Sequence, residues 1–179
     1  MCDCRHDIPH PGEPAPAAAP VSEEPARPVD LRPSWDDYFM DIAHVVKRRT
    51  NCSRRQVAAV LVLDKRIIAT GYNGTPRGVK NCFEGGCPRC ASNAPSGSGL
   101  GECLCSHAEE NAIVQSAYHG IRTKGATIYV TLSPCLTCAK MIINAGIVEV
   151  VYDEEYRFTD QTKALLAQAG VRCRRIVRN

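Results

Sequence analysis

Two short motifs, each opening a helix-like pattern, constrain how this chain can fold. His107-Ala108-Glu109 opens the first segment, and Pro134-Cys135-Leu136-Thr137-Cys138 opens the second. Cys135 and Cys138 are three residues apart, so they share one face of a helix's first turn, where the helix dipole favours thiolates. His107 and Glu109 would diverge on a regular helix. They can face one metal only if His107 lies where the backbone is still entering the helix.

These residue types suit a catalytic zinc. One imidazole and two thiolates supply three ligands to a tetrahedral ion and leave the fourth position for water, whereas a structural site is closed. Water bound to zinc has a pKa near neutrality, so hydroxide becomes available to attack an amidine carbon such as C4 of cytosine. Glu109 would take a proton from that water, protonate the ring nitrogen and help the amino group leave as ammonia.

Each motif alone is compatible with several kinds of site. A lone His-x-Glu is common, and Cys-x-x-Cys also occurs in redox-active sites and structural zinc knuckles. Together, in this order and with a strand between them, the motifs make up the signature of zinc deaminases. We therefore predict an enzyme in which Glu109 is catalytic and His107, Cys135 and Cys138 bind zinc.

The cysteine count and the net charge indicate the cellular compartment and the kind of binding partner to expect. Eleven cysteines without a secretory-signal pattern favour reduced thiols and bound metal over disulfides, so we expect a cytoplasmic protein. No apolar run is long enough for a membrane span. The net charge of +3 divides into −3 for residues 1–33 (three basic, six acidic) and, by subtraction, +6 for the remainder. A modestly cationic body suits an anionic small molecule and lacks the basic stripe of a dedicated nucleic-acid-binding protein.

The chain divides at about residue 33. Residues 1–33 are rich in Pro and Ala and have almost no large apolar side chains, which predicts a disordered tail. Residues 34–179 form the predicted catalytic domain. Within it, residues 79–105 show little periodicity and hold five cysteines, and a loop this long inside a compact domain usually needs a staple or a function.

The remaining segments alternate between helix and strand patterns. Ser34 with Asp37 resembles a capping box before an amphipathic helix starting at Trp35, and His44, off the apolar stripe, is expected at the surface. Two apolar runs, 57–63 and 67–72, predict a β-hairpin buried on both faces. We expect further helices at 108–119, 135–145 and 162–169, and further strands at 126–132, 147–152 and 171–177. This order predicts a three-layer α/β/α fold with a mixed five-stranded sheet. In such sheets active sites form where loops leave the carboxyl ends of strands and helices begin, and both motifs lie at such positions.

From Ser34 onward the motifs resemble the deoxycytidylate deaminases of the cytidine deaminase superfamily. The matching blocks are Gly71-Tyr72-Asn73-Gly74, His107 to Ile113, Ser133 to Lys140 and Ala145-Gly146-Ile147. The resemblance implies a fold of the cytidine deaminase type and hydrolysis of dCMP to dUMP and ammonia, supplying dUMP for thymidylate synthesis. It also implies a homohexamer that dCTP with Mg²⁺ activates and dTTP inhibits.

The resemblance extends to particular residues. It implies that His107, Cys135 and Cys138 are the zinc ligands, that Glu109 is the proton shuttle, and that Asn73 and Tyr156 contact the substrate. On sequence alone Asn73 could equally be a turn residue in the left-handed region, and Tyr156 a partly buried aromatic residue. Candidates for binding the phosphate, each equally consistent with a solvated basic face, are Arg54, Arg55, Arg77 and Arg157.

A second metal is the remaining sequence prediction. Some members of this family carry a further zinc, and Cys52 and Cys82 match positions that bind it. The pairs Cys87/Cys90 and Cys103/Cys105 have a spacing that alone could close a tetrahedral site. Six cysteines thus compete for four places, with unligated thiols as the alternative. We predict a second, structural zinc bound by Cys52, Cys82, Cys87 and Cys105.

Other functions share parts of this pattern. Deaminases of tRNA adenosine, of guanine and of the riboflavin pathway would share the zinc ligands and Glu109, and modified forms of dCMP are further candidate substrates. Those relatives normally lack the Gly-Tyr-Asn-Gly loop and the Cys-rich insert. An aromatic content of 6% also offers few stacking platforms for a polynucleotide. A zinc-stabilised binding module without turnover would have no use for Glu109 beside the metal.

Overall fold

The computed structural model of this chain describes residues 31–92, 94–95, 97–156 and 160–177. The chain divides into two units, 1–31 and 32–179, and only the second is described below. The predicted disordered tail, residues 1–33, falls outside the described residues except for its last three. Among the described residues, no helix has the length and apolar character needed to cross a membrane.

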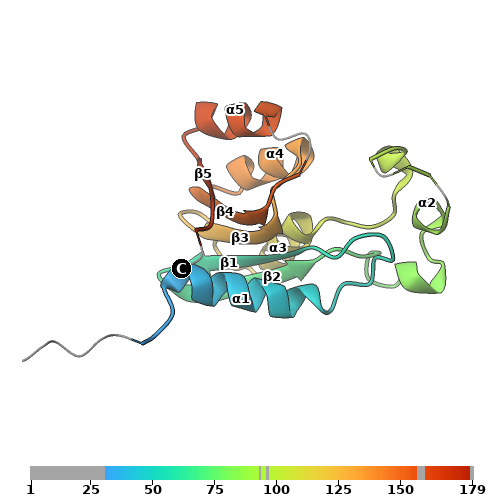
Figure 1. The fold of residues 1–179 in the computed structure, drawn as a ribbon, viewed down its shortest axis with the longest axis horizontal. Coiled ribbons are helices and arrows are strands. Elements are labelled where there is room, and N and C mark those ends of the chain that lie inside the picture. The colour runs from blue at the N-terminus through green and yellow to red at the C-terminus, as the bar shows by residue number, and fades with distance from the viewer. Residues whose placement is uncertain (1–30, 93, 96, 157–159, 178–179) are drawn as a thin grey trace, which may run out of the picture. The chain divides into compact units, whose positions relative to one another are not determined.

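A mixed five-stranded sheet forms the centre of the folded unit, in the order β2-β1-β3-β4-β5 (Figure 1). β1 (Ala58–Leu63) pairs antiparallel with β2 (Arg66–Tyr72) and with β3 (Thr127–Leu132). β3, β4 (Glu149–Glu154) and β5 (Arg172–Arg175) run parallel. Asp64 and Lys65 close the β1–β2 hairpin with φ values of 50° and 58°, as two-residue hairpin turns require. The predicted mixed five-stranded sheet is confirmed.

Helices cover both faces of this sheet, which confirms the three-layer prediction. On one face α1 (Trp35–Lys47) packs its buried residues Phe39, Met40 and Ala43 against Val60 and other strand residues. The opposite face carries α3 (Ala108–Tyr118), α4 (Leu136–Asn144) and α5 (Asp160–Gln168). Alternate residues of β1 point into the two cores, because successive side chains of a strand face opposite sides.

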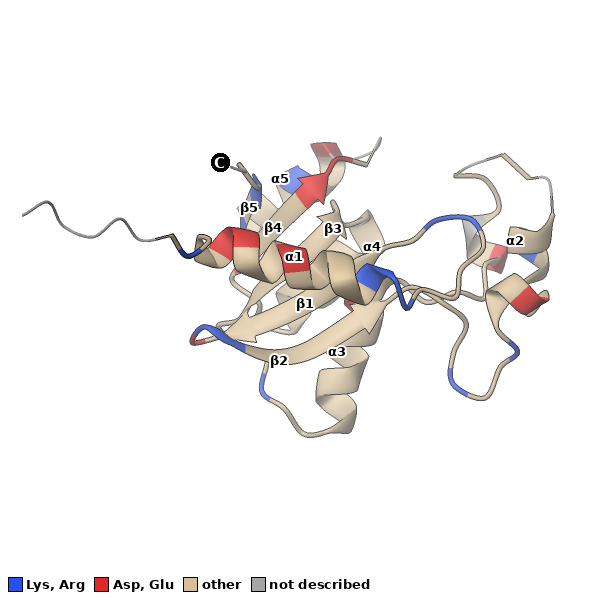
Figure 2. Cartoon of the chain, turned by 60° about the horizontal axis from the view of Figure 1, so that its bottom comes forward, with Lys and Arg blue, Asp and Glu red and all other residues tan. Residues whose placement is uncertain are grey.

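α1 begins as its sequence predicts. The Ser34 hydroxyl accepts a hydrogen bond from the Asp37 amide at 3.1 Å, and acidic residues in the first turn and Lys47 in the last suit the helix dipole (Figure 2). The predicted surface position of His44 is met only in part, because its side chain is 33% exposed. Its Nε2 atom lies 2.7 Å from a carboxylate oxygen of Asp153, because the end of β4 lies against this helix and half-buries the ring.

The hairpin is buried on both faces only along β1. β2 is the edge strand, and most of its side chains are exposed, so the prediction is wrong for this strand. At Gly71 this strand lies directly against α3. A Cβ atom added there would lie 2.2 Å from the carbonyl oxygen of Ala108 and 2.4 Å from the amide nitrogen of Ala112. Glycine therefore lets β2 and α3 approach backbone to backbone.

Between β2 and α3 the chain leaves the sheet and forms the Cys-rich insert, residues 79–105 (Figure 1). It contains three short helical turns, η1 (Cys82–Glu84), α2 (Pro88–Ala91) and η2 (Leu100–Glu102). The insert returns to the sheet domain through hydrogen bonds between the backbones of Ser106 and Gly74, at 2.9 and 3.2 Å. His107 follows directly, so the insert ends where α3 begins.

Candidate active site

His107 lies at the N-terminus of α3, where the backbone is still extended. It is the N-cap residue, with φ −77° and ψ 161°, and the Glu110 carboxylate accepts a hydrogen bond from its amide at 3.1 Å. The geometric condition set by the sequence is therefore met. An extended His107 followed by a helical Glu109 allows both side chains to face the same point.

α4 begins in the same way beside it. Cys135 is the N-cap residue, with φ −78° and ψ 170°, and Cys138 is buried in the first turn. The Nδ1 atom of His107 lies 3.3 Å from the Sγ of Cys138 and 3.4 Å from the Sγ of Cys135. Zinc–nitrogen and zinc–sulfur bonds in a tetrahedral site would give N···S separations of about 3.6 Å. The three predicted ligands therefore fit a zinc ion.

Glu109 is buried next to this group, with only 4% of its surface exposed. Burial raises the pKa of its carboxyl group to about 7, while attraction to His107 acts in the opposite direction. Among the described residues, the group that could hold a metal here consists of His107, Cys135 and Cys138, without Glu109. A carboxylate close to the ligands but outside their group is what a proton shuttle requires.

Of the three predicted ligand side chains, Cys135 and His107 are shifted toward their charged forms. A hydrogen bond from Cys138 lowers the pKa of Cys135 to about 4, and a hydrogen bond with Cys135 raises the pKa of His107 to about 9. The hydrogen bond with Cys135, together with burial, raises the pKa of the Cys138 thiol. Zinc binds the thiolate form of cysteine, and a helix N-terminus favours that form. The donor set therefore suits this ion chemically as well as geometrically.

Comparison with known proteins identifies the family. The family model described as the cytidine and deoxycytidylate deaminase zinc-binding region matches residues 33–154. The chain belongs to this zinc-binding deaminase family. Its fold is therefore of the cytidine deaminase type, as predicted from the sequence.

Several relatives are named as deoxycytidylate deaminases. That of Schizosaccharomyces pombe is 49% identical over 150 residues, which cover 84% of this chain and 46% of the yeast protein. That of Mycobacterium phage D29 is 43% identical, covering 69% of this chain and 98% of the phage protein. The crystal structure of the dCMP deaminase from cyanophage S-TIM5, in complex with dCMP and dUMP, superposes with a TM-score of 0.66 at 35% identity, covering 82% and 99% of the two chains. The chain spans about half the length of the yeast relatives it matches, 46% and 45%.

Asn73 lies at the end of β2 with its side chain almost fully buried. Its amide donates to the carbonyl of Arg55 at 2.7 Å, and its Oδ1 atom accepts from the amide of Val57 at 2.8 Å and from the Thr50 hydroxyl at 3.2 Å. The alternative of a left-handed turn residue is wrong, because Asp64 and Lys65 are the described non-glycine residues with positive φ. Asn73 instead fixes the loop before β1, which carries Arg55.

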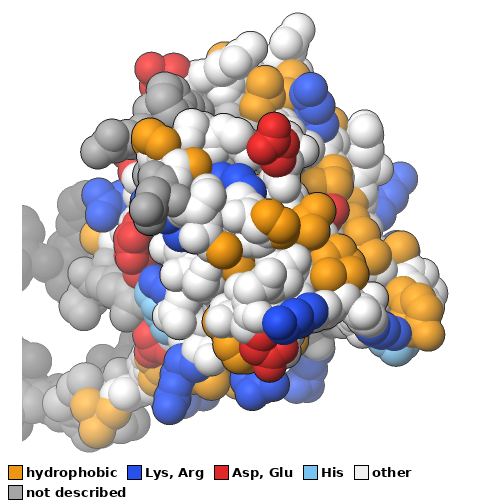
Figure 3. All heavy atoms as spheres, turned by 90° about the vertical axis from the view of Figure 1, so that its right-hand side faces the viewer, with side chains coloured by type: hydrophobic (Ala, Val, Ile, Leu, Met, Phe, Trp, Pro, Cys, Tyr) orange, Lys and Arg blue, Asp and Glu red, His pale blue; other side chains and the backbone are white. Residues whose placement is uncertain are grey.

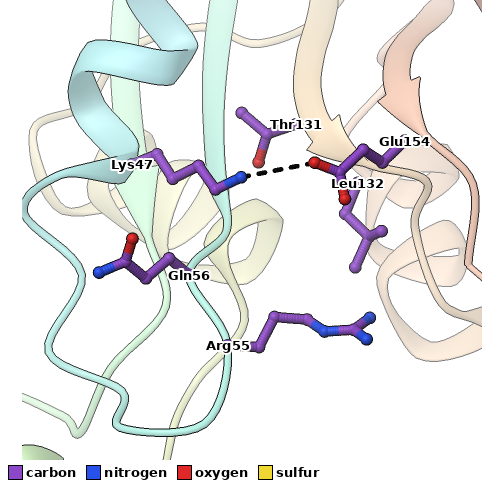
Figure 4. A pocket seen from close by; sticks show the side chains of 6 residues that line it. All are labelled: Lys47, Arg55, Gln56, Thr131, Leu132 and Glu154. Carbon is purple, nitrogen blue, oxygen red and sulfur yellow. Dashed lines mark ion pairs between the residues drawn. The ribbon is translucent and has the colours of Figure 1, made fainter.

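A cavity of about 300 Å³ opens at the ends of β3 and β4 (Figure 4). Arg55, Lys47 and Glu154 line it, and Lys47 is paired with Glu154 at 3.6 Å. Thr131 and Leu132, the last residues of the strand leading to Cys135, also line it. No sequence signal marks Lys47, which is simply the last residue of α1, so this lining residue was missed.

The four candidate phosphate-binding arginines differ in their position relative to this cavity. Arg55 lines it, and its guanidinium lies over the ring of Tyr156, 5.7 Å from the centroid. Arg54 instead donates to the carbonyls of Ser92 and Ala94 in the insert, at 3.1 and 2.7 Å. The guanidinium of Arg77 lies over the ring of Tyr118, and Arg157 lies outside the described residues.

The cysteines predicted to bind a second zinc are grouped differently from the prediction. Cys52, Cys82, Cys90 and Cys105 form one group, whose sulfur atoms all lie within 4.8 Å of one another. Cys87 falls in another such group, with Cys90, Cys103 and Cys105. The quartet predicted from the sequence joined Cys87 to Cys52 and Cys82 because spacing alone does not say how the insert folds back.

Proposed function

We propose that this chain catalyses the zinc-dependent hydrolysis of dCMP to dUMP and ammonia. The observation that carries the proposal is the convergence of two helix N-termini, which place His107, Cys135 and Cys138 around one point with Glu109 buried beside it. The substrate follows from the S-TIM5 neighbour, a dCMP deaminase in complex with dCMP and dUMP.

Zinc held by His107, Cys135 and Cys138 would supply an activated water as the nucleophile. Glu109 would accept one proton of that water and deliver it to the ring nitrogen of the cytosine. It would then carry the second proton, from the hydroxyl that has added to the ring carbon, to the amino group, which leaves as ammonia. A carboxyl group whose pKa is about 7 can both accept and donate a proton near neutral pH. The low exposure of Glu109 also excludes bulk water from the proton transfer.

The phosphate of the nucleotide would lie in the cavity lined by Arg55, near the guanidinium. The base would extend from it toward His107, Cys135 and Cys138, which do not line this cavity. An arginine presents a planar set of donors that fits phosphate oxygens, and contact with the Tyr156 ring limits where it can move. Tyr156 also donates its amide to the Ser133 hydroxyl at 2.7 Å, which places it beside the segment containing Cys135. Asn73 would complete the site by contacting the sugar with the amide hydrogen that Arg55 does not use.

The finer parts of the proposal come from the resemblance to deoxycytidylate deaminases. They are a homohexamer, activation by dCTP with Mg²⁺, inhibition by dTTP, structural zinc in addition to the catalytic ion, and a cytoplasmic role in supplying dUMP for thymidylate synthesis. Turnover of dCMP measured with and without dCTP, Mg²⁺ and dTTP, together with the molecular mass in solution, tests the regulation and the assembly.

The face drawn in Figure 3 does not support a polynucleotide substrate. On the face seen in Figure 3, Lys and Arg side chains are interspersed with acidic and uncharged ones instead of forming a continuous basic stripe. A deaminase of tRNA adenosine would be expected to bind its substrate through such a stripe.

Release of ammonia by the purified, zinc-loaded chain tests the function. The panel comprises dCMP, 5-methyl-dCMP, deoxycytidine, cytidine and a tRNA anticodon stem-loop. We expect turnover of dCMP that chelation abolishes and Zn²⁺ restores. Turnover of the stem-loop but not of dCMP would overturn the substrate assignment. A zinc-loaded chain that releases ammonia from none of them would instead support a non-catalytic binding module.

A further inference from the structure

The insert is built around sulfur. Cys82, Cys87, Cys90 and Cys105 are buried, and Cys52 and Cys103 pack against them as partly buried neighbours. No aliphatic or aromatic side chain of the described residues belongs to this cluster. Buried cysteines usually share a core with larger apolar residues, so a core made of thiols alone needs another source of stability.

Disulfides do not supply it. All six cysteines are free, and four of the sulfur pairs lie 3.7 to 4.0 Å apart, far beyond the S–S bond length of about 2 Å. Those separations do match another geometry. Sulfur atoms around a tetrahedral zinc with Zn–S bonds of about 2.3 Å lie about 3.8 Å apart. The cluster therefore has the dimensions of zinc–thiolate coordination.

The six sulfur atoms fall into two overlapping groups of four. One contains Cys52 and Cys82, the other contains Cys87 and Cys103, and both contain Cys90 and Cys105. Two tetrahedra that share an edge have this arrangement, since six corners then surround two centres. The Sγ atoms of Cys90 and Cys105, 4.0 Å apart, form the shared edge.

We propose that the insert binds a binuclear zinc cluster in which Cys90 and Cys105 bridge two zinc ions. Cys52 and Cys82 complete the coordination of one ion, and Cys87 and Cys103 complete that of the other. Thiolate ligands and tetrahedral geometry select zinc among the common divalent ions.

Hydrogen bonds to sulfur favour two ions over one. The amide of Ser53 donates to Cys82 and the amide of Leu104 donates to Cys87, both at 3.4 Å. Backbone amides aimed at sulfur stabilise thiolates and orient metal ligands. Cys82 belongs to one group of four and Cys87 to the other, and neither is shared between the groups. A single zinc ion would leave one of these two hydrogen-bonded thiolates without a metal.

The cluster ties the active site to the loops around it. Cys52 lies between α1 and β1, and Cys105 lies two residues before His107. The Ser106 backbone between Cys105 and His107 is paired with Gly74. Zinc ions in the insert would therefore fix the segment that enters α3 and sets the position of His107.

Metal content tests this proposal without reference to turnover. The full chain, purified under reducing conditions and saturated with Zn²⁺, should contain about three zinc ions. The His107→Ala variant should lose one and retain about two, and X-ray absorption at the zinc edge of that variant should show sulfur neighbours and a second zinc at about 3 Å. A zinc-edge spectrum without a zinc–zinc contribution, or about one structural zinc per chain, would overturn it.

Variants of the cysteines separate bridging from terminal positions. Cys90→Ser removes a shared ligand and should cost both cluster ions, whereas Cys103→Ser should cost at most one. Cys173→Ser, in β5 and outside both groups, is the matched control and should keep wild-type zinc content. Equal losses from Cys90→Ser and Cys103→Ser would contradict the bridging assignment. The spectrum of the His107→Ala protein decides the question if a cysteine variant fails to fold.

Discussion

The Nδ1 atom of His107 lies 3.3 Å from the Sγ atom of Cys138, although 31 residues separate them in the chain. The contact exists because α3 and α4 both begin at one edge of the sheet. Their N-terminal positions hold His107 and Cys135 in extended conformation, while Glu109 and Cys138 already lie in the helices. The proposed chemistry depends on this shared edge.

Replacement of Glu109 tests the proton shuttle. Glu109→Gln should retain fold and zinc but reduce kcat for dCMP by roughly 10²- to 10⁴-fold, because general acid–base help of this order is lost. The measurement is steady-state kinetics together with zinc content. Glu110→Gln is the matched control, since glutamine can still accept the hydrogen bond from the His107 amide. Near-wild-type turnover by Glu109→Gln would rule out this role.

Arg55 should contribute to recognition of the phosphate. Arg55→Ala should raise KM for dCMP by roughly 10- to 100-fold, since a hydrogen bond to a charged group contributes about 1.5–3 kcal/mol. Any weak activity on deoxycytidine, which has no phosphate, should be unchanged. Arg77→Ala serves as control because that guanidinium lies over Tyr118 and does not line the cavity. An equal effect on dCMP and deoxycytidine would mean that Arg55 acts through structure alone.

The close approach of β2 and α3 should make Gly71 intolerant of substitution. Gly71→Ala places a Cβ atom 2.2 Å from a backbone oxygen, so the helix or the strand must shift. We expect the free energy of unfolding to fall by about 1–3 kcal/mol, as for other overpacked cores, measured by chemical denaturation. Gly101→Ala is the control, because its Cβ would meet no atom within 4 Å. Equal stability of the two variants would contradict the packing described above.

A pH-dependent contact joins α1 to the sheet. The Arg174 guanidinium donates to Asp36 at 2.6 Å and, with help from the Tyr129 hydroxyl, lowers the pKa of that carboxyl group below its ordinary value of 3.8. A lowered pKa stabilises the fold above the ordinary value, and the stabilisation disappears as the pH falls through the lowered one. The Tm of Asp36→Asn should thus fall below that of wild type at pH 6, and the two should converge toward pH 2.

The control for this experiment is Asp64→Asn in the exposed β1–β2 turn. It should leave the pH dependence of Tm as it is in the wild type. A Tm difference between wild type and Asp36→Asn that stays constant from pH 6 to pH 2 would show that the ion pair does not contribute as described.

The convergence of His107, Cys135 and Cys138 could be predicted from the sequence because each motif is short and lies at a helix start. Local geometry then fixes where His107, Cys135 and Cys138 point, and only the approach of α3 to α4 had to be supplied by the fold. The edge position of β2 could not be predicted in this way. Its apolar residues fit a buried strand, and only the strand order leaves one side of it open.

The partition of the cysteines required three-dimensional information. Six candidates separated by up to 53 residues, from Cys52 to Cys105, leave many quartets open until the insert folds back on itself. Asn73 is a similar case. Its motif predicted a substrate contact, while the structure adds hydrogen bonds to Arg55 and Val57 that no local pattern contains.

Anomalous diffraction at the zinc edge from crystals of the zinc-loaded chain tests the central claim most directly. We predict a peak bonded to Nδ1 of His107 and to the Sγ atoms of Cys135 and Cys138, with the Glu109 carboxylate nearby but not bonded to the ion. A peak coordinated by Glu109 as fourth ligand, or no peak at this position in zinc-loaded crystals, would contradict it.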